Sequence, residues 1–217
     1  MSALPPLPAV PGRRPMSRSE TAIDAGLIVG GSVLFAGTAA LARTHEVAPA
    51  EAQVFRTLNG LPAALQAPTW AVMQAGSLAA TPVVAGLTWW SGRRRTAVGA
   101  AVVGLVAWGL PKLAKKGVRR GRPAAHLDEV QVRGQEQRGL GFPSGHAAVS
   151  TALGVTIGPS LSLPARLGVM AVAIETAGAR MYVGAHLPLD IAGGIGLGLA
   201  LGGLANLVLG DRAHDRR

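Results

Sequence analysis

Six long apolar segments make up most of this 217-residue chain and limit its fold more than any other feature. They cover approximately residues 22–42, 69–90, 96–111, 147–163, 165–183 and 187–209. A helix needs about 20 apolar residues to cross a bilayer, with a range of about 17–25. The first, second and sixth segments reach this length. The third and fourth reach it if Lys112 and Lys115 extend to the membrane surface and the helix after Pro143 starts within the interface. The sequence predicts an all-α fold, a six-transmembrane-helix bundle.

The composition agrees with a multi-pass protein of the cell membrane. Mean hydropathy is +0.34 and charged residues make up 15% of the chain, below the roughly 25% of soluble domains. The net charge is +10, and the basic residues lie between apolar segments with almost no aromatic residues among them. This pattern favours phosphate or anionic lipid over nucleic acid as the partner. The chain has no cysteine, which excludes disulfides and thiolate metal sites.

The chain divides into one membrane domain with two polar ends. Residues 1–20 are rich in Pro and Arg and predict a disordered cytoplasmic tail, residues 21–210 the six-span domain, and residues 211–217 a second cytoplasmic tail. Ala40-Leu41-Ala42 resembles a signal-peptidase site. The apolar segment before it exceeds the usual h-region of about 7–15 residues, so we expect this span to remain uncleaved.

Small residues recur at helical spacing in the first and last segments. Gly26 and Gly30 form a GxxxG pair, and Gly194, Gly198 and Gly202 form a longer row. Such rows allow helix backbones to approach closely in lipid. Packing through these glycines is one interpretation; the alternative, that glycine is simply common in this chain, accounts for about half of the matches.

Three short blocks of polar residues stand at the ends of apolar segments. They are Lys115-x6-Arg122-Pro123, Pro143-Ser144-Gly145-His146 and Arg180-x5-His186-x3-Asp190. Together they supply three cations, two imidazoles, one carboxylate, one hydroxyl and a glycine turn. This set of groups is suited to holding a phosphoryl group while a histidine attacks it.

His186 and Asp190 are four residues apart, which places them on one face at the start of a helix. A carboxylate bonded to one ring nitrogen leaves the other nitrogen free and basic, as a nucleophilic histidine requires. The alternative is an interfacial histidine beside a helix-capping Asp. Ser144 is a good N-cap, Gly145 allows close approach of a phosphate oxygen, and His146 can exchange a proton with the leaving group. An ordinary helix cap with an incidental histidine is the alternative here.

Arg122 and Arg180 can each hold two phosphoryl oxygens, whereas Lys115 acts as a point charge. An unpaired charge at Arg180, at the end of a span, is costly without an anionic partner. Lys116 would point about 100° away from Lys115 on a helix. Some of the other basic residues of this stretch are expected to touch anionic lipid at the membrane surface: Lys112, Lys116, Arg119 and Arg120 are the candidates.

The order and spacing of the three blocks resemble the type 2 phosphatidic acid phosphatase superfamily, over roughly residues 70–205. The resemblance implies that His186 is the nucleophile, that Asp190 orients it and that His146 is the general acid and base. It implies phosphate binding by Lys115, Arg122, Ser144, Gly145 and Arg180, with no metal and no cofactor. Ala179 stands where the family often has Ser, so one hydroxyl contact is missing.

The resemblance implies a membrane phosphatase that hydrolyses a lipid phosphate or diphosphate through a phosphohistidine. Polyprenyl diphosphate, phosphatidic acid and phosphatidylglycerol phosphate all fit as substrates. A phosphotransferase would use the same residues, and a non-catalytic lipid-phosphate-binding protein would need the cations but no general acid. A metal hydrolase would draw its ligands from His126, Asp128, His146, His186 and Asp190, although three nearby cations would repel a divalent ion.

Charge asymmetry gives the expected orientation. With six spans, ten arginines lie on the side of the termini. Arg43 and Arg56 lie on the other side, once the nine Lys and Arg residues in or near the motif blocks are set aside. The positive-inside rule then places both termini in the cytoplasm and the site on the extracytoplasmic face.

Glu175, inside the fifth segment, is a further functional candidate with no named partner. We expect Asp24 near the cytoplasmic interface and His126, Asp128 and Glu129 in a solvated loop.

Overall fold

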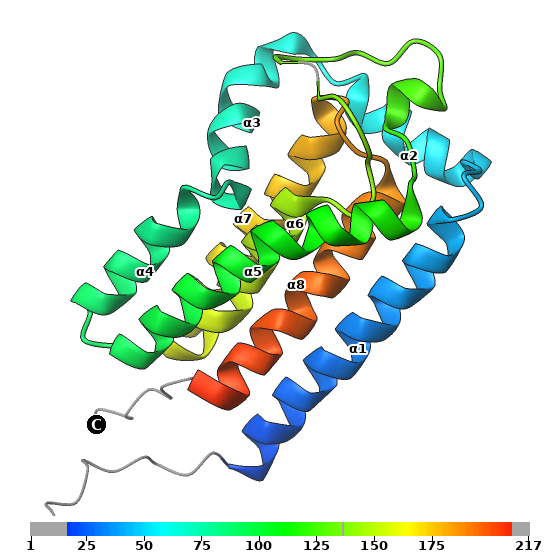
Figure 1. The fold of residues 1–217 in the computed structure, drawn as a ribbon. Coiled ribbons are helices and arrows are strands. Elements are labelled where there is room, and N and C mark those ends of the chain that lie inside the picture. Colours follow the sequence, from blue (N-terminus) through cyan, green and yellow to red (C-terminus); the bar gives the residue numbers. More distant parts are fainter. Residues whose placement is uncertain (1–16, 136, 210–217) are drawn as a thin grey trace, which may run out of the picture.

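The structure is a computed structural model that describes residues 17–135 and 137–209 (Figure 1). The described residues form helices and no strand, which confirms the all-α prediction for this part of the chain. The α-helices are α1 (Arg18–Ala42), α2 (Pro49–Asn59), α3 (Gln66–Met73), α4 (Ala80–Trp90), α5 (Arg94–Val118), α6 (Gly145–Ile157), α7 (Leu163–Tyr182) and α8 (Pro188–Leu209). Short 3-10 helices are η1 (Ala63–Leu65), η2 (Gln74–Gly76), η3 (Pro123–Ala125) and η4 (Gly158–Ser160). Of the predicted tails, residues 1–16 and all of 211–217 lie outside the described residues.

Three helical segments are long and apolar enough to cross a membrane: Arg18–Ala42, Arg94–Ala125 and Pro188–Leu209. The pair Ala63–Gly76 and Ala80–Trp90, bent by 67°, would make a fourth span if it counts as one. Helix α6 has only 13 residues. Helix α7 has 20 residues but includes three charged side chains, which lower its hydropathy: Arg166, Glu175 and Arg180. The described chain therefore contains three or four spans by length and composition, where the sequence predicted six.

The segment predicted as one span over 69–90 is broken between α3 and α4. Ser77 is extended, with φ −77° and ψ 162°, and Pro82 lies in the first turn of α4. Proline donates no hydrogen bond, and its ring would clash with the carbonyl of Leu78 in a continuous helix. A Cβ on Gly76 would lie 2.6 Å from the carbonyl oxygen of His146, so the break packs directly on the first turn of α6.

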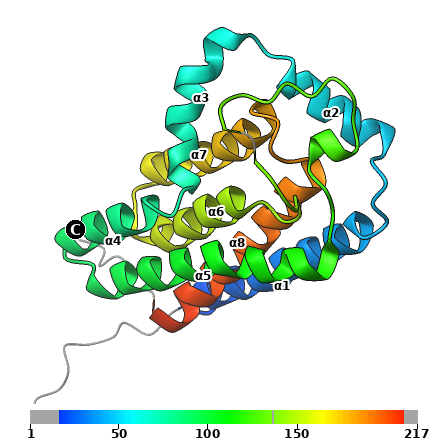
Figure 2. The same cartoon turned by 45° about the horizontal axis from the view of Figure 1, so that its top comes forward.

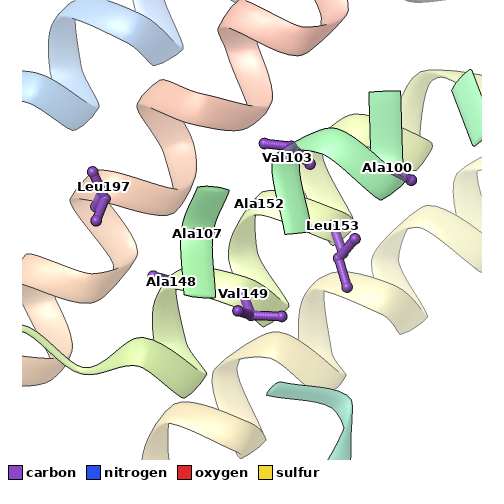
Figure 3. Close-up of a cluster of buried hydrophobic side chains, with 8 residues drawn as sticks. All are labelled: Ala100, Val103, Ala107, Ala148, Val149, Ala152, Leu153 and Leu197. Carbon is purple, nitrogen blue, oxygen red and sulfur yellow. The ribbon is translucent and has the colours of Figure 1, made fainter. Parts of the chain in front are cut away.

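Helices α5, α6 and α8 enclose the main apolar core (Figure 3). Its members are small or medium in size, which lets the three helices lie close together. They are Ala100, Val103, Ala107, Ala148, Val149, Ala152, Leu153 and Leu197. Helix α1 packs mainly along α8, on the side away from α6 and α7 (Figures 1 and 2).

The glycine row of the last segment packs as predicted, whereas the GxxxG pair of the first segment does not. A Cβ on Gly198 would lie 2.7 Å from the carbonyl oxygen of Ala148, so α6 lies directly on this row. Gly26 and Gly30 face open space, and a Cβ on either would meet nothing within 4 Å. The neighbouring Gly31 makes the contact with α8 instead, where its Cβ would lie 2.5 Å from the carbonyl oxygen of Gly196.

Helix α2 and the loop between α5 and α6 cover one end of the bundle (Figure 2). The side-chain nitrogen Nδ2 of Asn59 in α2 donates to the carbonyl oxygens of Tyr182, at 3.0 Å, and Met181, at 3.3 Å. The Asn59 side-chain oxygen accepts the Gln131 N–H at 2.8 Å. Arg133 donates to the carbonyl oxygens of Asn59 and Tyr182 at 2.7 and 2.6 Å. These bonds fix the covering loop to the end of α7, where the three polar blocks of the sequence meet.

Candidate active site

The three polar blocks converge at the covered end of the bundle because α5 and α7 end where α6 and α8 begin (Figure 1). Lys115 lies in the last turn of α5 and Arg180 in the last turn of α7. His146 lies in the first turn of α6 and Asp190 in the first turn of α8, with His186 in the connection before it. The fold therefore gathers the predicted groups from four helix ends.

His186 and Asp190 face each other as their spacing predicted. His186 Nδ1 lies 3.6 Å from Asp190 Oδ2, and both side chains are buried. The same carboxylate oxygen accepts the Leu187 N–H at 2.9 Å, which fixes it at the start of α8. At 3.6 Å the distance between His186 Nδ1 and Asp190 Oδ2 is longer than a hydrogen bond. The pair is oriented so that Nδ1 points to the carboxylate.

Burial lowers the pKa of the His186 imidazole well below its ordinary value, because the charged form loses its hydration. The positive charges of Arg180, Lys115 and Arg122, in that order, lower this pKa further. His146 is a further neighbour that acts on His186 in the same direction. The imidazole is therefore neutral at neutral pH, which is the form that can attack phosphorus.

The three predicted cations contact only neutral groups within the described residues. Lys115 Nζ donates to the carbonyl oxygens of Leu140 and Gly141, at 2.7 and 2.9 Å, so its inward register is as predicted. Arg122 Nη1 donates to the carbonyl oxygen of Ala185 at 2.8 Å. Arg180, 4% exposed, contacts the Met73 sulfur through Nη1, and its buried Nε has no hydrogen-bond partner among the described residues. Within that part of the chain, no carboxylate forms a salt bridge with any of the three cations.

The Pro-Ser-Gly-His block opens α6 and leaves room beside it. Ser144 is the N-cap, and its Oγ accepts the Ala147 N–H at 3.5 Å. Its own N–H donates to the carbonyl oxygen of Asp190 at 2.8 Å, which ties α6 to α8. The Ser144 side chain is fully buried and occupied by capping. A Cβ on Gly145 would meet nothing within 4 Å, so an anion can approach the backbone there.

Arg120 is not one of the basic residues that lie exposed at the membrane surface. It is completely buried, and its guanidinium forms two hydrogen bonds with Glu51 of α2, at 2.9 and 2.7 Å. The reason is the end of α5, where Arg119 adopts a left-handed conformation, φ 59°, and turns Arg120 inward. Glu51 was not singled out from the sequence, although it shares the buried face of α2 with Phe55 and Asn59. A carboxylate on the buried face of a helix indicates a buried cationic partner, and this pattern could have identified Glu51 from the sequence.

Gly141 is a second residue that the sequence did not indicate. A Cβ there would lie 2.7 Å from the carbonyl oxygen of Gly121 and 2.8 Å from Asp190 Oδ2. Its N–H donates to the carbonyl oxygen of Arg120 at 2.8 Å. The loop before α6 can therefore reach the Asp190 carboxylate only with glycine at this position.

Other candidates stand apart from the site. Glu175 is exposed on α7, whereas Asp24 is buried at the opposite end of the bundle, where it accepts from Asn206 Nδ2 at 3.3 Å. Asp128 and Glu129 are exposed in the covering loop, as expected. Among the described residues, no three His, Asp or Glu side chains lie together as a metal-binding group would.

A cavity of about 180 Å³ lies against the site, between α3 and the covering loop. Its inner wall includes Arg122, Arg180 and Met73. Trp70 and Arg133 lie farther along the same cavity. The cavity leads from the surface to two of the three uncompensated cations.

The family model of the PAP2 superfamily matches residues 95–213. The decaprenylphosphoryl-5-phosphoribose phosphatase of Mycobacterium tuberculosis, found in two strains, is 36% identical over 125 residues, which cover 58% of this chain and 68% of that protein.

Two crystal structures share the fold. The PAP2-type phosphatidylglycerolphosphate phosphatase of Bacillus subtilis has a TM-score of 0.66 and 22% identity, covering 83% of this chain and 94% of that one. Aquifex aeolicus LpxE has a TM-score of 0.58 and 19% identity, covering 70% and 92%. With a matching family model, a curated relative and two shared folds, the chain belongs to the PAP2 superfamily and is a membrane phosphatase of that family.

Proposed function

We propose that this protein hydrolyses the phosphate ester or diphosphate of a membrane lipid through a phosphohistidine formed on His186. The observation that carries the proposal is the convergence of Lys115, Arg122 and Arg180 on a buried, neutral His186. Three positive charges without carboxylate partners suit the equatorial oxygens of a transferring phosphoryl group. Asp190 then stabilises the positive charge that forms on the attacking imidazole.

The reaction has two steps. The free ring nitrogen of His186 attacks phosphorus, the bond from phosphorus to the leaving oxygen breaks, and His146 donates a proton to that oxygen. Water then attacks the phosphohistidine while His146 takes a proton from it, which releases inorganic phosphate and restores both histidines. His146 is placed for this role because it follows the open backbone at Gly145, in the first turn of α6.

The proposed substrate class is a polyprenyl-linked phosphate. The mycobacterial relative, 36% identical, is named for decaprenylphosphoryl-5-phosphoribose, and this name supports a polyprenyl lipid. The cavity beside the site offers Trp70 as an aromatic wall and Arg133 as a polar one to a headgroup that carries the phosphate. Undecaprenyl diphosphate, phosphatidic acid and phosphatidylglycerol phosphate are the comparison substrates.

We further propose six spans, in which α6 and α7 cross the membrane beside the three long helices and the α3–α4 pair counts as one span. The site then faces the extracytoplasmic side, in agreement with the arginine excess near the termini. Both statements rest on charge distribution and on the length of the apolar segments.

The deciding experiment measures phosphate release by the detergent-purified protein across this lipid panel, together with trapping of the intermediate. We expect a ³²P label that is stable in alkali and labile in acid, and no label and no turnover in His186→Ala. His146→Ala should lower turnover by about 10²–10⁴-fold. A label that persists in His186→Ala would overturn the assignment of the nucleophile. Activity lost in EDTA and restored by Zn²⁺ or Mn²⁺ would favour a metal hydrolase instead.

A further inference from the structure

A buried ion pair lies directly behind the His186–Asp190 pair. Arg120 is 0% exposed, and its two terminal nitrogens bind the two carboxylate oxygens of Glu51 at 2.9 and 2.7 Å. The same Arg120 Nη1 lies 3.4 Å from Asp190 Oδ1. Arg120 therefore touches Glu51 on one side and Asp190 on the other.

This arginine differs from the three cations around His186. Lys115, Arg122 and Arg180 contact carbonyl oxygens or a thioether, and their charge is left for an anionic ligand. Arg120 faces two carboxylates and has no exposed surface, so its charge is already matched and it cannot reach a phosphate. Any effect of Arg120 on the site is therefore exerted through Asp190.

The two oxygens of Asp190 have separate partners. Oδ2 faces His186 Nδ1 and accepts the Leu187 N–H, while Oδ1 faces Arg120. Glu51 Oε1 also accepts the Leu189 N–H, at 3.0 Å, so α2 holds the first turn of α8 as well. Contacts on both oxygens prevent the carboxylate from rotating about its terminal torsion, which is otherwise broad.

We infer that Glu51 and Arg120 are a positioning pair that fixes the Asp190 carboxylate and, through it, His186. The inference rests on the proposed role of His186 as nucleophile. Glu51 also sets the charge: with Arg120 neutralised by Glu51, Asp190 keeps one net negative charge opposite the imidazole. Without the Glu51 charge, Arg120 would neutralise Asp190, and the cation formed on His186 would lose its counter-charge.

The test compares kcat and KM of purified variants with the lipid substrate. Glu51→Gln keeps the shape of the side chain and removes the charge, and we expect kcat to fall by about 10–100-fold, as for other residues that orient reactive groups. KM should change by less than about threefold, because the three phosphate-facing cations are untouched. Glu51→Asp, which restores the charge, should recover part of kcat. Glu46→Gln is the matched control, since the Glu46 side chain is exposed in the connection before α2 and Arg120 contacts only its carbonyl oxygen, which the variant keeps; it should behave as wild type.

Coupling to Asp190 separates positioning from general stability. In an Asp190→Asn background, Glu51→Gln should change the residual kcat by less than about threefold, because the carboxylate it orients is gone. Multiplicative losses would overturn the inference. If Glu51→Gln folds poorly, Glu51→Gln/Arg120→Gln removes both buried charges. That double variant should have a near-normal Tm and a reduced kcat, and wild-type kcat in it would also overturn the inference. Activity that survives His186→Ala would instead refute the proposed function itself.

Discussion

Gly198 offers the sharpest test of how the helix packing holds the site. A Cβ at this position would lie 2.7 Å from the Ala148 carbonyl oxygen and 2.7 Å from Thr151 Cβ, whereas ordinary contact begins at 3.4 Å. Gly198→Ala must therefore move α6 away from α8 by about 0.7 Å, the difference between these two distances. The partners are backbone and a β-branched side chain, which cannot move aside independently.

Two consequences follow from that displacement. Overpacking of this kind costs about 1–3 kcal/mol, so the Tm in detergent should fall. The same shift separates His146 on α6 from Asp190 on α8, and a misplacement near 1 Å costs up to about 100-fold in rate. We expect kcat for lipid phosphate to fall about 10–100-fold, although Gly198 itself touches no site residue.

Gly26→Ala is the matched control, because a Cβ there would meet nothing within 4 Å. Its kcat should equal that of wild type, and its Tm should stay level or rise, since Ala is favoured over Gly in a helix by up to about 1 kcal/mol. The assay is phosphate release at saturating substrate, with thermal unfolding followed on the same samples. Equal Tm and kcat for Gly198→Ala and Gly26→Ala would refute the packing argument.

Three further predictions concern single residues. Lys115→Ala should reduce kcat/KM far more than Lys112→Ala, because Lys115 Nζ points into the site and Lys112 lies over the Trp108 ring; equal losses would remove Lys115 from the site. Because the pKa of His186 is lowered in the folded state, the unfolded chain binds a proton below about pH 6.5 that the folded chain does not. The free energy of unfolding should therefore fall as the pH drops below that value, by at most about 1.4 kcal/mol per pH unit. The Tm of His186→Gln should fall less over the same range, and parallel pH profiles would contradict the burial of a neutral imidazole. In a chain without native cysteine, a Cys at Gln135 should react with an impermeant maleimide in intact cells while a Cys at Ser91 should not, and the reverse pattern would invert the proposed topology.

The site was more predictable than the packing because its signals are local in sequence. The four-residue spacing of His186 and Asp190 across a helix start predicts that they meet, and a serine before an apolar segment predicts the N-cap at Ser144; both predictions use only local sequence. The inward register of Lys115 was implied by the family resemblance, through its spacing to Arg122-Pro123, and helix geometry added only that Lys116 points elsewhere. Arg120 and Glu51, 69 residues apart, meet only through the tertiary fold, and nothing in the local pattern of either residue pairs them.

The packing was less predictable because apolar composition does not specify continuity or partner. The segment over 69–90 has no charged residue, yet it is divided at the extended Ser77 and Pro82. Gly26 and Gly30 have the spacing of a packing motif, whereas Gly31 has none and makes the contact. Which face of α1 meets α8 depends on both helices, and the sequence of one helix alone does not contain that information.

The pairing of α1 with α8 also sets the order in which the bundle is completed during synthesis. Gly31 and Gly196, whose backbones meet, are 165 residues apart. At about 5–20 residues per second, a ribosome takes on the order of 8–33 s to make the intervening chain. Helix α1 thus waits for α8 to be made, and α8 also carries Asp190, which faces His186. Closure of the bundle and completion of the candidate site are therefore one event that depends on α8, and a chain cut short before α8 has neither.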